Sequence, residues 1–222
     1  MKTTGYRIFK NDILKDVQIL FKTKNVDLST PEINKMLIER FQSIGYEYTP
    51  NTLDVFKKNS IFVVVQSSSV MVTIGKNDYK DRESFAKEFQ LIVDCIDSVE
   101  GVEYELLLCS KTNQIEFDRE RVELAGLSSD KLRYLVFSDS YIQNEKEYIR
   151  TDRNASVLVS NTNYEQEKSI GIRLQLMAIT EVNGGKEMLM DELNNLHTLI
   201  YETFIDCISD YLYEIMKGEE NV

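Results

Sequence analysis

The sequence is poor in residues that interrupt regular structure and in the residue most often used as a general base. Its 222 residues include two prolines, nine glycines and one histidine, and no stretch is of low complexity. With 42% hydrophobic residues the chain can bury a substantial core, as one large domain or as two small ones. The longest apolar runs, IFVVV and YLVF, are too short to span a membrane. An ordered globular protein with no membrane-spanning segment is therefore expected.

Cysteine is scarce as well. Cys95, Cys109 and Cys207 are odd in number, far apart and without a CxxC pair, which argues against a disulfide framework or a zinc knuckle. We interpret them as buried thiols. The opening residues MKTTGYRIFKNDILKD lack the apolar core and cleavage site of a signal peptide, so a cytoplasmic location is expected.

Positive charge is in deficit, and the formal net charge is −11. Nucleic-acid binding through a general basic surface is disfavoured, because phosphate contacts need clustered lysine and arginine. A local basic patch is left open. Most of the excess negative charge lies at the C-terminus, where residues 181–222 hold ten carboxylates against two lysines.

The common catalytic and cofactor motifs are missing too. The sequence contains no GxSxG elbow, no GxxxxGK[ST] and no GxGxxG, and a single histidine would have to serve any Ser-His or Cys-His pair. No cofactor is expected.

The hydrophobic pattern that is present alternates between strand and helix periods. Residues 13–21 follow a period of two, and a helix is predicted after Pro31 and another through Phe85, Phe89 and Ile92. The stretches LDVF, IFVVV and VMVTI predict adjacent antiparallel strands. Strands are also predicted at VEYELLLCS, NQIEF, LRYLVF, SVLVS and IGIRLQLMAIT, whereas residues 118–129 are ambiguous. Asn183-Gly184-Gly185 predicts a hairpin closing onto KEMLM, and Asp191 is predicted to cap the long C-terminal helix that follows.

This order favours an α+β fold with mostly antiparallel sheet packed by amphipathic helices and ending in a long helix. Two sheet-plus-helix halves are expected, at residues 1–100 and 101–222, which can also form a single domain. The stretches IVDCIDS and FIDCISD look alike and each follows a run of strands, so a duplicated unit is one hypothesis.

The only histidine, His197, lies on the apolar side of the predicted last helix, away from that helix's own carboxylates. We interpret it as a buried or interface residue that helps to define the fold. A role as general base or pH-sensitive interface group is the alternative. The predicted structural residues are His197, Phe85, Phe89 and Phe204.

Four carboxylates follow one another at intervals of four along the same predicted helix: Glu202, Asp206, Asp210 and Glu214. One interpretation is a solvated face that favours solubility. The other is a docking surface for a basic partner, or a mimic of nucleic-acid charge.

The residues Asp54, Asp78 and Lys80 are the candidate metal site. Asp78-Tyr79-Lys80 has the D-x-K spacing of a magnesium-dependent nuclease, in which carboxylates hold the metal and a lysine polarises water. The alternative is that these are ordinary capping and solvating residues.

Three segments, FKNDILKDVQILFK, VMVTIGKNDYKDRESFAKEF and LMDELNNLHTLIYETFIDCISDYLYEIM, resemble in that order a sporadically distributed family of uncharacterised prokaryotic proteins. The matching positions are Asn11, Val17, Phe21, Tyr79, Phe85, Leu193, Leu196, His197 and Phe204. Where the family carries an R-x-G-L-R-Y-x-N strand, this chain has YELLLCSKTNQIEF. The family has no established activity or catalytic residue. The resemblance implies a cytosolic protein of patchy occurrence, of the kind found in mobile elements, phage or defence operons.

Three functions are therefore considered. The first is a non-catalytic interaction protein, an accessory, regulatory or inhibitory partner in a bacterial or phage conflict (antiviral defence) system. Its partner would be another protein, operon-encoded or a host target, and homo-oligomers are left open. The second is a metal-dependent nuclease or hydrolase. The third is a SecB-like chaperone that binds unfolded clients through sheet edges and apolar grooves.

Overall fold

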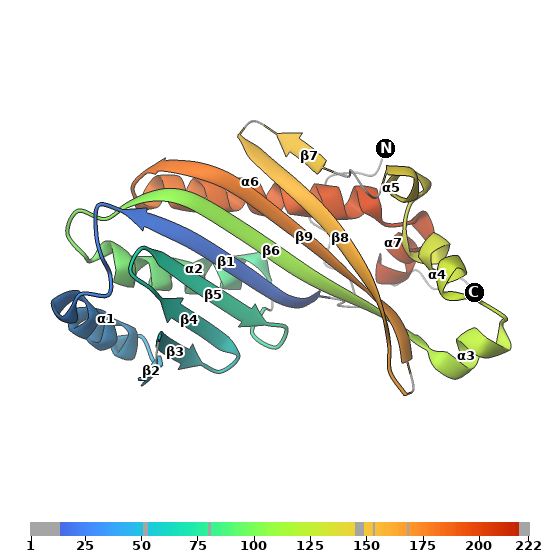
Figure 1. Cartoon of the computed structure of the whole chain (residues 1–222), viewed down its shortest axis with the longest axis horizontal. Coiled ribbons are helices and arrows are strands. Elements are labelled where there is room, and N and C mark those ends of the chain that lie inside the picture. The colour runs from blue at the N-terminus through green and yellow to red at the C-terminus, as the bar shows by residue number, and fades with distance from the viewer. Residues whose placement is uncertain are drawn as a thin grey trace. The chain divides into compact units, whose positions relative to one another are not determined.

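The computed structural model describes residues 14–50, 53–79, 81–144, 149–152, 154–167 and 169–217, and shows a mixed α+β protein (Figure 1). The strands in this part are β1 (Leu14–Lys24), β2 (Glu47–Thr49), β3 (Asp54–Lys58), β4 (Ile61–Val65), β5 (Ser69–Gly75), β6 (Glu103–Asp118), β7 (Ile149–Asp152), β8 (Ala155–Glu165) and β9 (Ser169–Gly184). The helices are α1 (Pro31–Ser43), α2 (Arg82–Asp97), α3 (Arg119–Leu124), α4 (Ser129–Val136), α5 (Asp139–Asn144), α6 (Lys186–Cys207) and α7 (Asp210–Lys217).

The strands form one sheet in the order β2-β3-β4-β5-β1-β6-β9-β8-β7. The pairs β1–β5, β2–β3, β3–β4, β4–β5 and β7–β8 are antiparallel. This confirms the α+β class with antiparallel sheet that the sequence predicts.

The chain divides into two compact units, each assembled from separate segments. Unit 2 comprises Asp16–Ser110 and Ile179–His197, and unit 1 comprises the other residues, chiefly Lys111–Ala178 and Thr198–Val222. The elements β1, β6, β9 and α6 contribute residues to both. The contiguous halves 1–100 and 101–222 therefore describe the order of elements along the chain and not its compact units, and their standing as domains stays a prediction.

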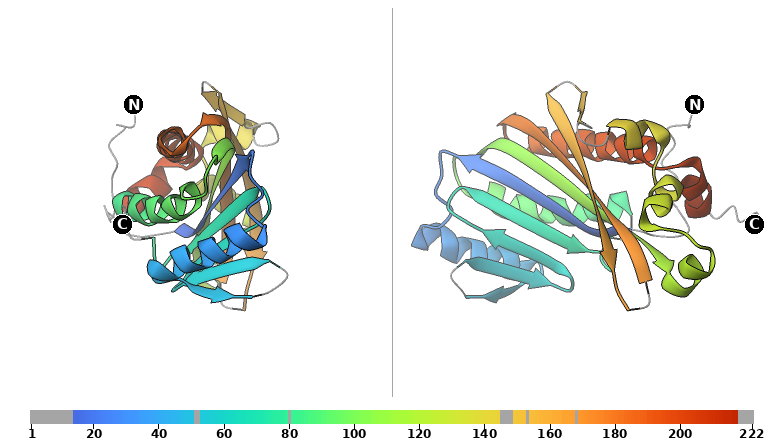
Figure 2. Two further views of the ribbon diagram at one scale, coloured as in Figure 1. Left: turned by 90° about the vertical axis from the view of Figure 1, so that its left-hand side faces the viewer. Right: turned by 45° about the vertical axis from the view of Figure 1, so that its right-hand side comes forward.

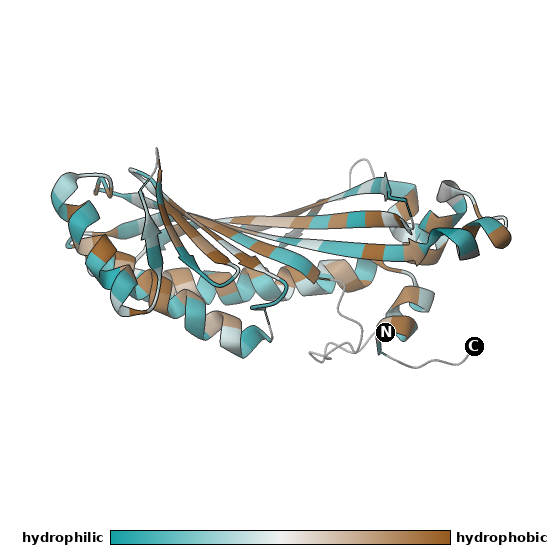
Figure 3. Ribbon diagram, turned by 90° about the horizontal axis from the view of Figure 1, so that it is seen from below, coloured by the Kyte–Doolittle hydropathy of each residue, from teal (hydrophilic) through white to brown (hydrophobic). Residues whose placement is uncertain are grey.

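Unit 2 has its core between the sheet and the helices α1 and α2. Strand register places Phe56, Val63, Val72 and Ile19 side by side in one buried row across β3, β4, β5 and β1. The ring of Phe41 from α1 stacks on Phe56 with centroids 4.3 Å apart, and Phe89 from α2 meets Phe21 edge-on at 5.8 Å. Such aromatic pairs contribute about 0.5–1.5 kcal/mol each beyond the area they bury. Figures 2 and 3 show the helices on one side of these strands.

Local signals explain where the two helices of unit 2 begin. Pro31 occupies the first turn of α1, where a missing N–H is tolerated. The Asp81 carboxylate accepts a hydrogen bond of 2.7 Å from the Ser84 N–H and so caps α2. This bond lowers the pKa of the Asp81 carboxyl group.

The two halves of the sequence contain the same series of elements. In the first, β1 is followed by the meander β3-β4-β5 and then α2; in the second, β6 is followed by β7-β8-β9 and then α6. Counted outward from the first strand, the sheet order is β1-β5-β4-β3 in one half and β6-β9-β8-β7 in the other. The stretches IVDCIDS and FIDCISD occupy matching places, at the ends of α2 and α6. The strand order thus supports the duplication hypothesis.

The predicted long C-terminal helix is confirmed as α6, but its apolar pattern does not continue unbroken to Ile215, because the helix is interrupted at Ile208–Ser209 and α7 follows. In unit 1, the Ser209 N–H donates to the Val136 carbonyl at 2.9 Å, and the Ser138 N–H donates to the Cys207 carbonyl at 2.8 Å. The Ser209 hydroxyl then accepts from the Leu212 N–H at 3.1 Å and caps α7. Backbone bonds to the segment between α4 and α5 replace the helical ones, and this ends α6.

Two predicted strands are also wrong. KEMLM is the first part of α6, and LRYLVF lies mostly in α4. Leu189 and Leu193 are four residues apart and both buried, as are Leu132 and Val136. This spacing places each pair on one helix face, so tertiary burial outweighs the strand propensity of short apolar runs.

We predict that Gly171→Ala destabilises the protein by about 1–3 kcal/mol, the usual cost of overpacking. In unit 1 a Cβ atom at Gly171 would overlap the Tyr164 ring and would lie 2.7 Å from the Ile115 carbonyl oxygen. Tyr164 is itself held, because its hydroxyl donates to Glu116 at 2.9 Å. Urea unfolding measures the effect. Gly185→Ala is the matched control, since a Cβ atom there would meet nothing within 4 Å, and equal losses in both variants would contradict the prediction.

Candidate functional site

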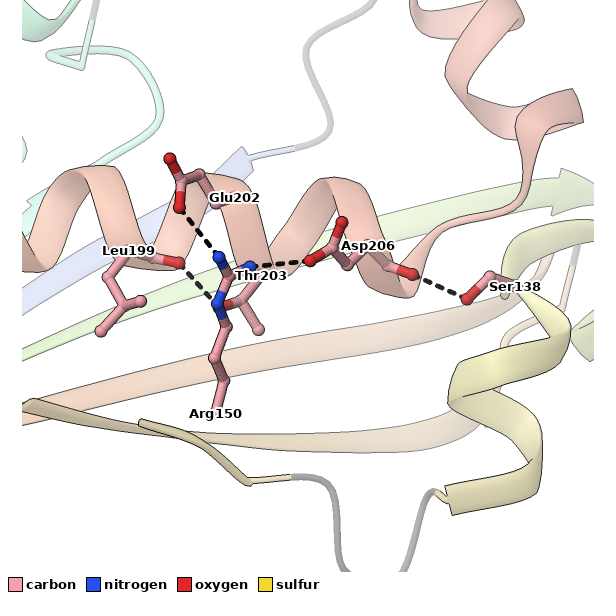
Figure 4. A network of polar contacts seen from close by, with 6 residues as sticks. All are labelled: Ser138, Arg150, Leu199, Glu202, Thr203 and Asp206. Carbon is pink, nitrogen blue, oxygen red and sulfur yellow. Dashed lines mark hydrogen bonds and ion pairs between the residues drawn. The ribbon is translucent and has the colours of Figure 1, made fainter. Parts of the chain in front are cut away.

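The four carboxylates that the sequence places along one C-terminal helix lie in two different helices. Glu202 and Asp206 lie in α6, whereas Asp210 and Glu214 lie in α7. In unit 1, Arg150 of β7 forms ion pairs with Glu202 at 3.0 Å and with Asp206 at 2.7 Å (Figure 4). Glu214 pairs with Lys217 at 2.9 Å. The four carboxylates therefore do not form one uncompensated stripe, and their role as a docking surface stays a prediction.

Arg150 belongs to a wider polar network in unit 1. The Ser138 hydroxyl donates to the Asp206 carbonyl at 2.7 Å, and the buried Thr203 hydroxyl donates to the Leu199 carbonyl at 2.7 Å (Figure 4). The network joins α6 to β7 and to the residue before α5. Two of the predicted interaction residues thus hold elements of the protein together.

The two described residues of the candidate metal site, Asp54 and Asp78, are not brought together by the fold. In unit 2 the Asp54 carboxylate accepts hydrogen bonds from Asn34 and, at 2.8 Å, from the Tyr48 hydroxyl. The Asp78 carboxylate accepts from the Ser60 N–H at 2.7 Å and from the Ser60 hydroxyl. Asp54 pairs with the last residue of β4 and Ser60 precedes the first, so the two sites are separated by a strand length of roughly 16 Å. Lys80 lies outside the described residues.

No group of three or more His, Cys, Asp or Glu side chains among the described residues could hold a metal ion. All three cysteines are buried. Burial raises the pKa of the Cys95 thiol to about 11, so it is protonated and poorly nucleophilic at neutral pH.

His197 lies in an aromatic cluster of unit 2. Its side chain is 3% exposed, and its ring centroid is 4.7 Å from that of Phe85 in α2 and 6.4 Å from that of Tyr79. One helical turn earlier, the Arg82 guanidinium donates to the Asn194 side-chain oxygen at 3.2 Å. The other predicted structural residues, Phe85, Phe89 and Phe204, are buried as well.

A second polar cluster in unit 2 ties β3 and the turn after α1 to α2. The Tyr46 hydroxyl donates to Glu88 at 2.9 Å, and the Lys58 ammonium pairs with the same carboxylate at 2.9 Å. Burial, and then the Glu88 charge, raise the pKa of Tyr46. Because Tyr46 and Lys58 both bind the Glu88 carboxylate, the cluster connects these elements.

The surface that sequence reasoning missed is the face of unit 2's strands opposite α1 and α2. Strand register places Val55, Val64, Met71 and Leu20 in one row across β3, β4, β5 and β1 on that face, with Phe62 in the next row. We call these five side chains the open-face patch. Phe62 and Met71 are each 39% exposed and the other three are half-buried. No described helix of unit 2 covers this face (Figures 2 and 3).

The border of the open-face patch carries charges of both signs. Lys57 lies 5.5 Å from the Phe62 ring centroid and faces Glu47 across β2 and β3. Lys22 and Asp16 mark two further borders on β1. An apolar centre with a mixed polar rim is the usual make-up of a protein-binding surface. The signal in the sequence is the unbroken run IFVVV, since a strand with a solvated face ordinarily alternates apolar and polar residues.

We predict that His197→Ala lowers the free energy of unfolding by about 2–4 kcal/mol, because it leaves a cavity against the Phe85 ring. Thermal and urea unfolding measure the loss. Asn195→Ala, on an exposed position of the same helix, is expected to change stability by less than about 0.5 kcal/mol. An unchanged melting temperature in His197→Ala would show that the ring is not a packing element.

We predict that Arg150→Ala destabilises the protein by about 0.5–1.5 kcal/mol, since partly exposed ion pairs contribute little individually but one guanidinium here bridges two carboxylates. The loss should shrink in about 1 M salt, where charges are screened within about 3 Å. Lys131→Ala removes an exposed cation of α4 as a control. A loss that does not depend on salt would assign the effect to packing of the arginine stem.

Comparison with known proteins gives no family. No family model matches the chain, and no curated protein matches it. Among solved structures, a chain of Clostridium acetobutylicum aspartate kinase is similar at 10% sequence identity and a TM-score of 0.23. That match covers 91% of this chain but 37% of the kinase chain, so this chain spans little more than a third of the kinase's length. Within the described residues, no helix is both long and apolar enough to cross a membrane.

Proposed function

We propose that this protein is a non-catalytic protein-interaction component, acting as an accessory, regulatory or inhibitory partner in a bacterial or phage conflict system. The observation that carries the interaction role is the open-face patch. Five apolar side chains lie on the uncovered face of four paired strands, with the most exposed, Phe62 and Met71, on neighbouring strands. A sheet with apolar residues on both faces is stabilised when a second layer covers the bare face.

The candidate chemical groups in the described residues support the same proposal. Asp54 and Asp78 are bound by separate partners, and His197 is buried among aromatic rings. Each of these side chains has a structural role where it lies. The conflict-system part of the proposal is supported by the resemblance of three segments to a family of patchy occurrence.

A SecB-like chaperone is the second candidate, and a separate feature of unit 1 favours it. Ile149 of the edge strand β7 pairs with Leu158 of β8, and these side chains are 60% and 46% exposed. An edge strand with exposed apolar side chains is suited to an extended client segment that adds to the sheet.

We expect a photo-crosslinking residue at position 71 to capture one discrete protein in the native host, at least about tenfold more efficiently than one at Glu39, an exposed position of α1. Capture should be lost in Phe62→Ser/Leu20→Ser, whose circular dichroism confirms folding, because desolvated central residues carry most binding energy. Equal capture from both positions, or none, would reject the interaction role.

The other readouts separate the candidates. In an infection assay, deleting the gene and introducing Phe62→Ser/Leu20→Ser should change phage plating efficiency in the same direction. If plating efficiency is unchanged while position 71 still crosslinks to its partner, the conflict-system role is rejected but the interaction role is not. Binding of a reduced, permanently unfolded protein that is lost in Ile149→Ser/Leu158→Ser would favour the chaperone.

A further inference from the structure

The matching series of elements in the two halves extends to a specific residue correspondence. Placing IVDCIDS at the end of α2 on FIDCISD at the end of α6 needs one shift, from Asp94 to Asp206. The same shift of 112 residues makes Arg82 correspond to Asn194 and Phe85 to His197. These correspondences follow from sequence position alone.

The corresponding residues contact each other in unit 2. Arg82 donates to the Asn194 side chain at 3.2 Å, across 112 residues, and the Phe85 and His197 rings are 4.7 Å apart. When two identical subunits associate around a twofold axis, residues beside the axis meet their own counterparts. Two such contacts, one helical turn apart, place a pseudo-twofold axis near the start of α2.

The pairing directions agree with that axis. Arg82, at the start of α2, meets Asn194, whereas Lys186, at the start of α6, pairs with Asp94 near the end of α2. The two helices are therefore antiparallel, as a twofold axis that lies across them requires.

The first strands of the two halves, β1 and β6, are also arranged as a twofold axis across them requires. β1 and β6 are neighbours in the sheet. Lys24 pairs with Glu103 at 3.3 Å, and the Phe21 ring lies 5.7 Å from that of Tyr104. Figure 1 shows β1 and β6 running in opposite directions, so these strands are antiparallel too.

We infer that the chain is a tandem duplication whose halves, 1–100 and 101–222, meet through a twofold-type interface built by β1 with β6 and by α2 with α6. The partner that each half's interface fits is a second copy of the same unit. The interaction is intramolecular in this chain, and the exposed connection at Glu100–Gly101 only tethers the halves. Gly101 has φ +79°, and a Cβ atom added there would meet nothing within 4 Å, so the space around that position is open.

The test is to insert a site-specific protease sequence between Glu100 and Gly101 of the full chain and to cut it after folding. The nicked protein should elute as a 1:1 complex at the volume of the uncut protein and regain its circular dichroism spectrum after dilution from urea. A cut between the exposed residues Ser67 and Ser68, inside the β4–β5 hairpin of one half, is the control and should refold less completely. Separation of the halves, or better refolding of the control, would overturn the inference.

A second measurement applies even if the inserted sequence prevents folding. In an experimental structure, superposing β1, β3, β4, β5 and α2 on β6, β7, β8, β9 and α6 should need a rotation close to 180° and should align Phe85 with His197. A rotation far from 180°, or an alignment that separates these two residues, would also overturn it.

Discussion

The antiparallel register of β3, β4, β5 and β1 is the constraint on which unit 2 depends. Because side chains alternate between the faces of a strand, the register sorts every second residue toward α1 and α2 and the rest away from them. The inner rows, such as Phe56, Val63, Val72 and Ile19, form the core with Phe41 and Phe89. A shift of one residue would expose that core and bury Lys57. The same register creates the open-face patch, so core and candidate site have one cause.

The repeated series of elements gives the fold an economical explanation. Each half supplies a first strand, a three-stranded meander and a helix, and the halves differ in what is inserted: α1 and β2 follow β1, whereas α3, α4 and α5 follow β6. Only the second half continues into α7. The insertion before β7 is also what interrupts the C-terminal helix, because residues 136–138 take the backbone bonds at Cys207 and Ser209. Divergence between the halves thus has a direct structural consequence.

Some carboxylates of this acidic chain are neutralised by cations of the same chain. Arg150 compensates Glu202 and Asp206, and Lys58 compensates Glu88 beside the Tyr46 hydroxyl. Both groups connect elements distant in sequence. Acidic residues at helical spacing therefore predict which face of their own helix carries carboxylates. Whether that face presents net negative charge depends on cations from other elements, such as Arg150 of β7.

The sequence by itself determined most elements and the class of the fold, since period-two and helical patterns are local. It also placed His197 and Phe85 on apolar helix faces, and both are buried. Only the tertiary structure decided that KEMLM and LRYLVF are helical, that Asp54 and Asp78 are apart, and that His197 meets Phe85. These outcomes depend on burial, strand register and contacts between residues about a hundred positions apart, for which a linear pattern carries no signal.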